Sequence, residues 1–171
     1  MRAGDPTTPT RPGAEDIRHW LETVTDPEIP VLTIADLGIL QDVHVTEDGV
    51  EVVITPTYSG CPAMRTIEEN IVEVLGRHGV DDVRVTTRIS PPWTTDWLSE
   101  EGRRKLLAYG IAPPAEQSTS KKALFGTSPV IACPQCGSTR TSRISEFGST
   151  ACKALYRCED CLEPFDYFKC I

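Results

Sequence analysis

Long apolar runs and histidine are what this sequence has least of. None of its apolar stretches approaches the roughly 18 residues that a membrane-spanning helix needs, and no stretch near the N-terminus resembles a signal peptide. Only three histidines occur, His19, His44 and His78. We therefore expect no membrane partner and a cytoplasmic location, in which cysteine thiols bind metals rather than pair as disulfides.

Two signatures of redox enzymes are also missing. The chain has no Glu-x-x-His pair of the kind that holds a di-iron centre, and no Gly-x-Gly-x-x-Gly loop for a nucleotide cofactor. Its 171 residues allow one ordinary domain plus a small second unit. We expect that the chain does not catalyse a redox reaction by itself.

The negative charge is unevenly distributed along the chain. Residues 1–111 carry 10 basic and 19 acidic side chains, residues 112–130 carry two and one, and residues 131–171 carry five and five, which gives the net charge of −8. No segment offers the basic surface that a phosphate backbone requires, so we expect no nucleic-acid partner. A zinc-ribbon nucleic-acid module is the alternative, and a flat salt dependence of binding would exclude it.

Six of the seven cysteines lie in the last 39 residues, and four of them form two Cys-x-x-Cys motifs separated by 21 residues. This spacing is typical of a zinc ribbon with a tetrahedral shell of Cys133, Cys136, Cys158 and Cys161. Iron in the same four-sulfur geometry, or an iron–sulfur cluster, is the alternative. We expect short antiparallel strands around the site and a metal that contributes folding energy.

Cys152 and Cys170 are not needed for that shell. They are either small core residues of the ribbon or extra thiols that handle metal or redox equivalents.

The chain divides into four segments by composition. Residues 1–13 are rich in Pro and Thr and predict disorder, residues 14–111 form an α/β domain, residues 112–130 have the composition of a linker, and residues 131–171 form the ribbon. Hydrophobic periodicity predicts the order αββαβ and a final helix that ends at Gly110, within an α+β fold. The expected elements are a helix over 14–24, strands over 39–46 and 50–57, a helix from Cys61 to 76–79, and a parallel strand over 83–89.

Cys61 lies in a tight loop between the second strand and the following helix. Pro62 suits the first helical position, so we expect Cys61 at the N-cap, where the helix dipole and free amides would lower the pKa of its thiol. Cys61 is then a reactive or metal-binding sulfur, and the alternative is a small buried apolar residue. No histidine lies nearby in the sequence to act as a base, so a hydrolase is poorly supported.

Three acidic residues, Asp26, Glu28 and Asp36, lie in the Pro-interrupted segment before the first strand. Capping and solvated surface explain such residues by default. The functional alternative is that Glu28 faces Cys61.

The segments DPEIPVLTIADLGI (26–39) and TPTYSGCPA (55–63) resemble the iron–sulfur cluster assembly factors that include SufT. The resemblance implies a site at Cys61, with Asp26, Glu28 and Thr55 as supporting residues. The remaining matching positions are Asp36, Leu37 and Gly38.

The PPWTTDW segment and the ribbon are similar to the PaaD family, the D subunits of bacterial phenylacetyl-CoA epoxidases, a resemblance that covers residues 14–171. It implies an accessory component of a multicomponent monooxygenase in aerobic phenylacetate catabolism. Di-iron chemistry would belong to another subunit, and electrons would arrive through a reductase with flavin and an iron–sulfur cluster. These subunits, the reductase above all, are the expected partners.

From this resemblance we expect Cys61 to hold a transient iron or iron–sulfur cluster as an exchangeable ligand. One thiolate is too few for a stable cluster, so Cys61 would share it with a client or with a second protomer in a homodimer. Aromatic residues of the ribbon, Phe165, Tyr167 and Phe168, would form a docking rim. The alternatives are a structural scaffold subunit, an iron–sulfur assembly factor unrelated to phenylacetate, and a thiol-dependent enzyme.

Overall fold

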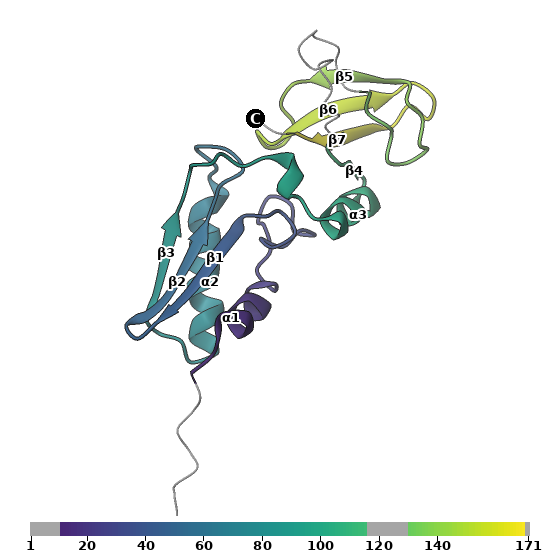
Figure 1. The fold of residues 1–171 in the computed structure, drawn as a ribbon. Coiled ribbons are helices and arrows are strands. Elements are labelled where there is room, and N and C mark those ends of the chain that lie inside the picture. The colour runs from purple at the N-terminus through teal and green to yellow at the C-terminus, as the bar shows by residue number, and fades with distance from the viewer. Residues whose placement is uncertain (1–10, 116–129, 170–171) are drawn as a thin grey trace, which may run out of the picture.

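The computed structural model describes residues 11–115 and 130–169 in two lobes (Figure 1). The disorder expected for residues 1–13 falls almost wholly outside these ranges, as do most of the expected linker and Cys170.

The first lobe is a three-stranded sheet packed on helices. Its order is β1-β2-β3, with β1 antiparallel and β3 parallel to the central strand β2. Helices α1 and α2 pack against each other and contact the sheet (Figure 1). The αββαβ order and the parallel third strand are therefore confirmed. The elements are α1 (Ala14–Leu21), β1 (Leu40–Thr46), β2 (Gly49–Ile54), α2 (Ala63–Arg77) and β3 (Val83–Thr87).

Burial explains why these segments form these elements. In α2 the four buried residues are spaced by four, Ala63, Ile67, Ile71 and Leu75, which places them in one stripe along the helix. The middle strand β2 is buried at five of its six positions, as expected for a strand with neighbours on both sides. It leads directly into the loop of residues 55–61.

The PPWTTDW segment folds back onto the Asp-Leu-Gly turn. Trp93 Nε1 donates a hydrogen bond to the backbone oxygen of Leu37 at 2.7 Å. Gly38 has φ +65°, and a Cβ there would lie 2.6 Å from the backbone oxygen of Trp97. Only glycine fits this close approach, so these two sequence motifs form one structural unit.

Helix α3 (Glu100–Tyr109) follows a single 3-10 turn, η1 (Thr95–Trp97). Ser99 caps α3 by accepting a hydrogen bond from Gly102 N at 2.8 Å, and Gly110 ends it in the left-handed conformation with φ +88°. The predicted end of this helix at Gly110 is confirmed.

The second lobe is a four-stranded sheet in the order β4-β7-β6-β5. Strands β5 (Thr141–Ser145), β6 (Lys153–Cys158) and β7 (Pro164–Phe168) are antiparallel, as predicted for the ribbon. Strand β4 (Ile111–Ala112) follows α3 directly and pairs in parallel with β7. Two residues carry no periodicity, so the sequence did not reveal β4.

An aromatic contact joins the lobes. Phe168 is 1% exposed and belongs to the same core cluster as the α/β domain residues. Its ring lies edge-on to that of Trp93, with centroids 5.9 Å apart. Phe165 is also buried. The expectation that both phenylalanines belong to a docking rim is therefore wrong, because Phe165 packs inside the ribbon against Tyr156 and Phe168 packs against the first lobe.

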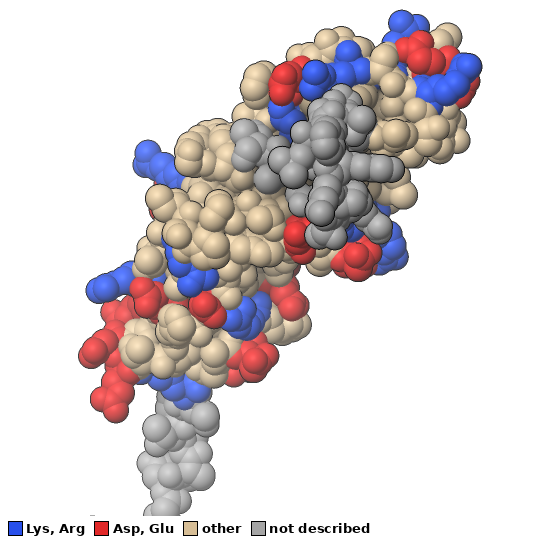
Figure 2. Space-filling model, turned by 45° about the horizontal axis from the view of Figure 1, so that its top comes forward, with Lys and Arg blue, Asp and Glu red and all other residues tan. Residues whose placement is uncertain are grey.

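Within the described ranges, no helix is both long and apolar enough to cross a membrane. On the face drawn in Figure 2, Lys and Arg side chains are interspersed with Asp and Glu. This mixture differs from the basic stripe that is typical of nucleic-acid-binding surfaces.

Candidate metal and thiol sites

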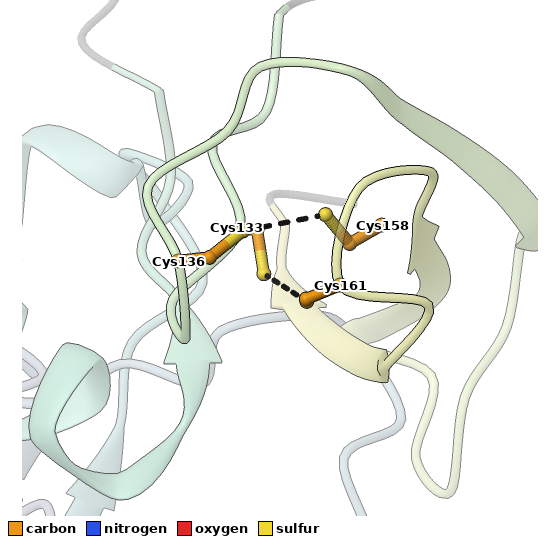
Figure 3. Close-up of side chains that lie close together, drawn as sticks. All are labelled: Cys133, Cys136, Cys158 and Cys161. Atoms are coloured by element: carbon orange, nitrogen blue, oxygen red, sulfur yellow. Dashed lines mark hydrogen bonds between the residues drawn. The ribbon is translucent and has the colours of Figure 1, made fainter.

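The four cysteines of the two Cys-x-x-Cys motifs converge at one end of the ribbon (Figure 3). All four sulfur atoms lie within 4.8 Å of one another. Cys133 Sγ is 3.7 Å from Cys161 Sγ, and Cys136 Sγ is 3.5 Å from Cys158 Sγ. A tetrahedral shell with metal–sulfur bonds of about 2.3 Å has sulfur atoms about 3.8 Å apart, so the arrangement fits one metal ion.

Two tight backbone turns carry the four sulfurs. The chain turns with φ +74° at Gly137 and with φ +65° at Leu162, each directly after a motif. N–H groups of Cys161 and Asp160 donate to the Cys158 sulfur and lower the pKa of that thiol to about 7. The left-handed turn after the first motif, at Gly137, is thus repeated after the second motif at a leucine, which sequence reasoning did not single out.

Cys61 lies in the loop between β2 and α2, half-buried against the core cluster of the first lobe. Helix α2 begins at Ala63 with Pro62 as its N-cap, so Cys61 precedes the cap by one residue. The N–H of Ala63 and the hydroxyl of Tyr58 both donate to its sulfur. These donors favour a thiolate.

The pKa of Cys61 is nevertheless raised above its ordinary value. Burial is the main cause, and the nearby carboxylates of Glu28 and Asp26 add to it. Together these effects outweigh the Ala63 N–H and Tyr58. The expectation of a lowered pKa is therefore wrong, because it considered the helix end and not the charges brought in by another segment. In the metal-free chain the thiol stays protonated at neutral pH.

Cys152 of the second lobe lies beside Glu28 of the first. Its Sγ is 3.8 Å from Glu28 Oε2 and 3.1 Å from Thr150 Oγ1, and the residue is 4% exposed. Burial, with contributions from Glu28, Asp26 and Cys61, raises the pKa of Cys152 to about 11. The Glu28 carboxylate therefore contacts the Cys152 sulfur, and its negative charge helps to raise the pKa of Cys61.

Asp26 and Asp36 hold backbone in place. One oxygen of Asp26 accepts hydrogen bonds from Glu28 N and Ile29 N, each at 2.8 Å, and so shapes the loop that presents Glu28. Asp36 accepts from Thr33 N at 3.0 Å and from Lys105 Nζ at 2.6 Å. Of these three acidic residues, Glu28 is the one whose carboxylate meets a cysteine sulfur.

Thr55 Oγ1 is an unexplained polar atom. Among the described residues it is one of two buried side-chain N or O atoms with no hydrogen-bond partner, the other being Arg88 Nε. Thr55 is 0% exposed and lines a cavity of about 180 Å³ together with Tyr58 and Trp93. A buried hydroxyl without a partner is costly, so Thr55 is a candidate site residue.

The histidines do not complete a catalytic pair with Cys61. His78 follows the far end of α2, where its ring stacks on Trp20 with centroids 4.0 Å apart.

Two family comparisons match two separate parts of the chain. Residues 14–87 match the family described as iron-sulfur cluster assembly protein, and residues 117–169 match the PaaD zinc beta ribbon domain. The resemblance expected from the Cys61 loop and from the two Cys-x-x-Cys motifs is confirmed.

Individual relatives point to the same two families. The chain is 48% identical over 160 residues, 94% of each chain, to an Escherichia coli (strain K12) protein named as the putative D subunit of 1,2-phenylacetyl-CoA epoxidase. It is 34% identical over 91 residues, 52% of this chain and 99% of the relative, to the Staphylococcus aureus (strain USA300) Fe-S protein maturation auxiliary factor SufT. A crystal structure of a DUF59 domain from Bacillus anthracis matches with a TM-score of 0.51 and 28% identity, covering 54% of this chain and 90% of that chain.

Proposed function

Because this chain belongs to the PaaD family of 1,2-phenylacetyl-CoA epoxidase components and joins an iron–sulfur assembly region to a zinc ribbon, we propose that it is a non-catalytic accessory subunit of that monooxygenase. Its task is to assemble or maintain the iron–sulfur or iron centre of a partner subunit in aerobic phenylacetate catabolism. The partner we favour is the reductase that carries flavin and an iron–sulfur cluster.

One observation carries this proposal: the half-buried Cys61 thiol lies among hydrogen-bond donors and beside carboxylates, in the domain related to maturation factors. Thiolate and carboxylate are both ligands for iron. Because burial and Glu28 raise the pKa of Cys61, a metal has to displace a proton in order to bind. Binding is then weaker than at a preformed thiolate, which suits a ligand that must release its cargo.

Tyr58, Ala63 and Thr55 support this cysteine. The Tyr58 hydroxyl and the Ala63 N–H donate to the sulfur and would orient its lone pairs. The unpartnered hydroxyl of Thr55 would accept or donate a hydrogen bond once a cluster or a partner group enters the loop.

The ribbon would hold zinc through Cys133, Cys136, Cys158 and Cys161. Four sulfurs with tetrahedral spacings leave no open position for substrate, so the ion would be structural. Zinc would link the two turns of a lobe whose own core is small, and would thereby keep β6 and β7 against the first lobe.

The competing function is that of a scaffold subunit, for which the chemistry of Cys61 is irrelevant. It is favoured by the tight packing between the lobes at Phe168 and Trp93. An assembly factor that serves clients outside phenylacetate catabolism would share the Cys61 chemistry and differ only in its clients.

Coexpression of the epoxidase subunits with the wild type or Cys61→Ser would test the proposal. We expect Cys61→Ser to lower the iron content of the reductase or oxygenase and the epoxidase activity in parallel. Thr66→Ala, an exposed change in the helix that follows the loop, is the matched control and should leave both unchanged. Normal partner iron and activity with Cys61→Ser would overturn the assembly role in favour of the scaffold.

A further inference from the structure

Of the two described thiols outside the ribbon shell, Cys152 is the more deeply buried, and it comes from one lobe and faces a carboxylate of the other. We propose that Cys152 and Cys61 together with Glu28 form a composite site for ferrous iron at the junction of the lobes. The choice of iron rests on the proposed function. The structure gives the contact of Cys152 with Glu28 and packs Cys61 against the same core cluster, and metal binding would have to bring the three groups together.

The first support is the contact between Cys152 Sγ and Glu28 Oε2 at 3.8 Å. A sulfur and a carboxylate oxygen that bind one metal at about 2.3 and 2.1 Å lie about 3.6 Å apart in tetrahedral geometry. The observed pair therefore needs only a small adjustment to share a metal ion.

The second support is that Cys61 belongs to the same neighbourhood. It packs against the core cluster that includes Cys152. The negative charges of Glu28 and Asp26 help to raise the pKa of both thiols. Cys61 and Cys152 in turn help to raise the pKa of Tyr58. These effects agree with the packing of Cys61 and Cys152 against one core cluster.

The third support is that this region concentrates anionic groups without enough positive charge. Glu28 and Asp26 lie in one loop, where Asp26 Oδ1 accepts hydrogen bonds from Glu28 N and Ile29 N at 2.8 Å. Lys153 is engaged with Asp166 at 3.5 Å. A divalent cation between the thiols and Glu28 would replace repulsion by attraction and would let both thiols ionise.

The fourth support is the buried hydroxyl of Thr55, which has no partner and lies in the loop that carries Cys61. It lines the same small cavity as Tyr58, whose hydroxyl donates to the Cys61 sulfur. An unsatisfied polar group at this position is consistent with a ligand that completes the loop.

This arrangement removes a difficulty of a site with Cys61 alone. One thiolate binds iron too weakly to carry it, and the ribbon supplies a second one from within the same chain. Because Cys152 immediately precedes β6, its position depends on the folded ribbon. The ribbon metal would thus control iron binding without contacting iron.

The test is anaerobic equilibrium dialysis of the zinc-loaded full chain against ferrous iron. We expect about one iron per chain beyond the zinc in the wild type, and at least about tenfold weaker binding in Cys61→Ser and in Cys152→Ser. The double variant should be little weaker than either single one, since both ligands serve one ion. Ser149→Ala, an exposed change near Cys152, is the matched control and should bind as the wild type does.

A second measurement does not depend on how well Cys152→Ser folds. Phenylarsine oxide forms two arsenic–sulfur bonds with a close pair of thiols and releases one water. In the zinc-loaded wild type we expect an adduct that peptide mapping places on Cys61 and Cys152. No adduct, or one that joins Cys152 to Cys170, would overturn the composite site.

The two proposals fail in different ways. If Cys152→Ser binds iron as the wild type does while Cys61→Ser does not, the composite site is wrong and the assembly role of Cys61 stands. If both variants lose iron binding but partner iron stays normal on coexpression, the site stands and the assembly role is wrong. If the wild type binds no ferrous iron beyond the zinc, the composite site is wrong.

Discussion

The ring of Phe168 meets the ring of Trp93 edge-on, with centroids 5.9 Å apart and an interplanar angle of 85°. Phe168 ends β7 of the ribbon, and Trp93 is anchored through its indole nitrogen to the backbone of Leu37 in the first lobe. This pair is the clearest reason why the ribbon holds a fixed place on the α/β domain, and why a cysteine of the ribbon lies beside Glu28.

Phe168→Ala should therefore lower the free energy of unfolding by about 3 kcal/mol or more, because it removes a buried ring from the shared core. It should also make Cys152 accessible to alkylation under native conditions. Denaturant unfolding and mass spectrometry would measure the two effects. Ile144→Ala, at a residue 54% exposed, is the control and should change stability by less than about 0.5 kcal/mol. Equal effects of the two changes would contradict the role of Phe168.

Gly38 and Gly79 allow a matched test of the Asp-Leu-Gly turn. Both have positive φ, +65° and +78°, but a Cβ would lie 2.6 Å from Trp97 O at Gly38 and would meet nothing within 4 Å at Gly79. Gly79→Ala should cost about 1 kcal/mol for the left-handed backbone alone. Gly38→Ala should cost about 2 kcal/mol more, because the PPWTTDW segment has to move. Thermal unfolding of the two variants would measure the difference in stability. Similar losses of stability would show that the contact between Gly38 and Trp97 is not tight.

The pH dependence of Cys61 alkylation follows from its raised pKa. Only the thiolate reacts, so the zinc-loaded chain should alkylate slowly at pH 7, and the rate should rise about tenfold per pH unit up to a midpoint above the ordinary thiol value. Glu28→Gln removes a neighbouring negative charge, lowers that pKa and should speed the reaction about threefold or more at pH 8. Site-resolved mass spectrometry would follow the reaction at Cys61.

Glu22→Gln serves as the control for that experiment, since Glu22 is exposed beside α1 and its carboxylate pairs with His19. It should leave the profile unchanged. Fast alkylation of Cys61 in the wild type at neutral pH would contradict the raised pKa. It would favour the alternative that the chain is a thiol-dependent enzyme.

Removal of the ribbon metal should unfold the second lobe first. Cys136→Ser changes an exposed ligand and so disturbs packing little, but it should lower the zinc content well below one per chain. The ribbon should then unfold at lower denaturant than the α/β domain, in a separate transition. Elemental analysis and unfolding curves would measure this. Thr139→Ala, an exposed change near the first motif, is the control. A single transition like that of the wild type would contradict a structural metal.

Local patterns determined much of this protein. Apolar spacing specified α2, because a helix buries one face at its own period. Runs of β-branched residues specified β2 and β3, because such residues favour strands. The two Cys-x-x-Cys motifs specified the four-sulfur cluster, since each motif forms its own turn and a ribbon leaves few ways to combine two such turns.

Tertiary structure decided what the remaining thiols do. Cys152 and Glu28 are 124 residues apart, and no spacing rule connects them. The direction of the Cys61 pKa likewise depended on burial and on charges from another segment, against the local preference of the helix end. Long-range packing creates the low-dielectric region in which these groups act on one another, so only the folded chain could reveal it.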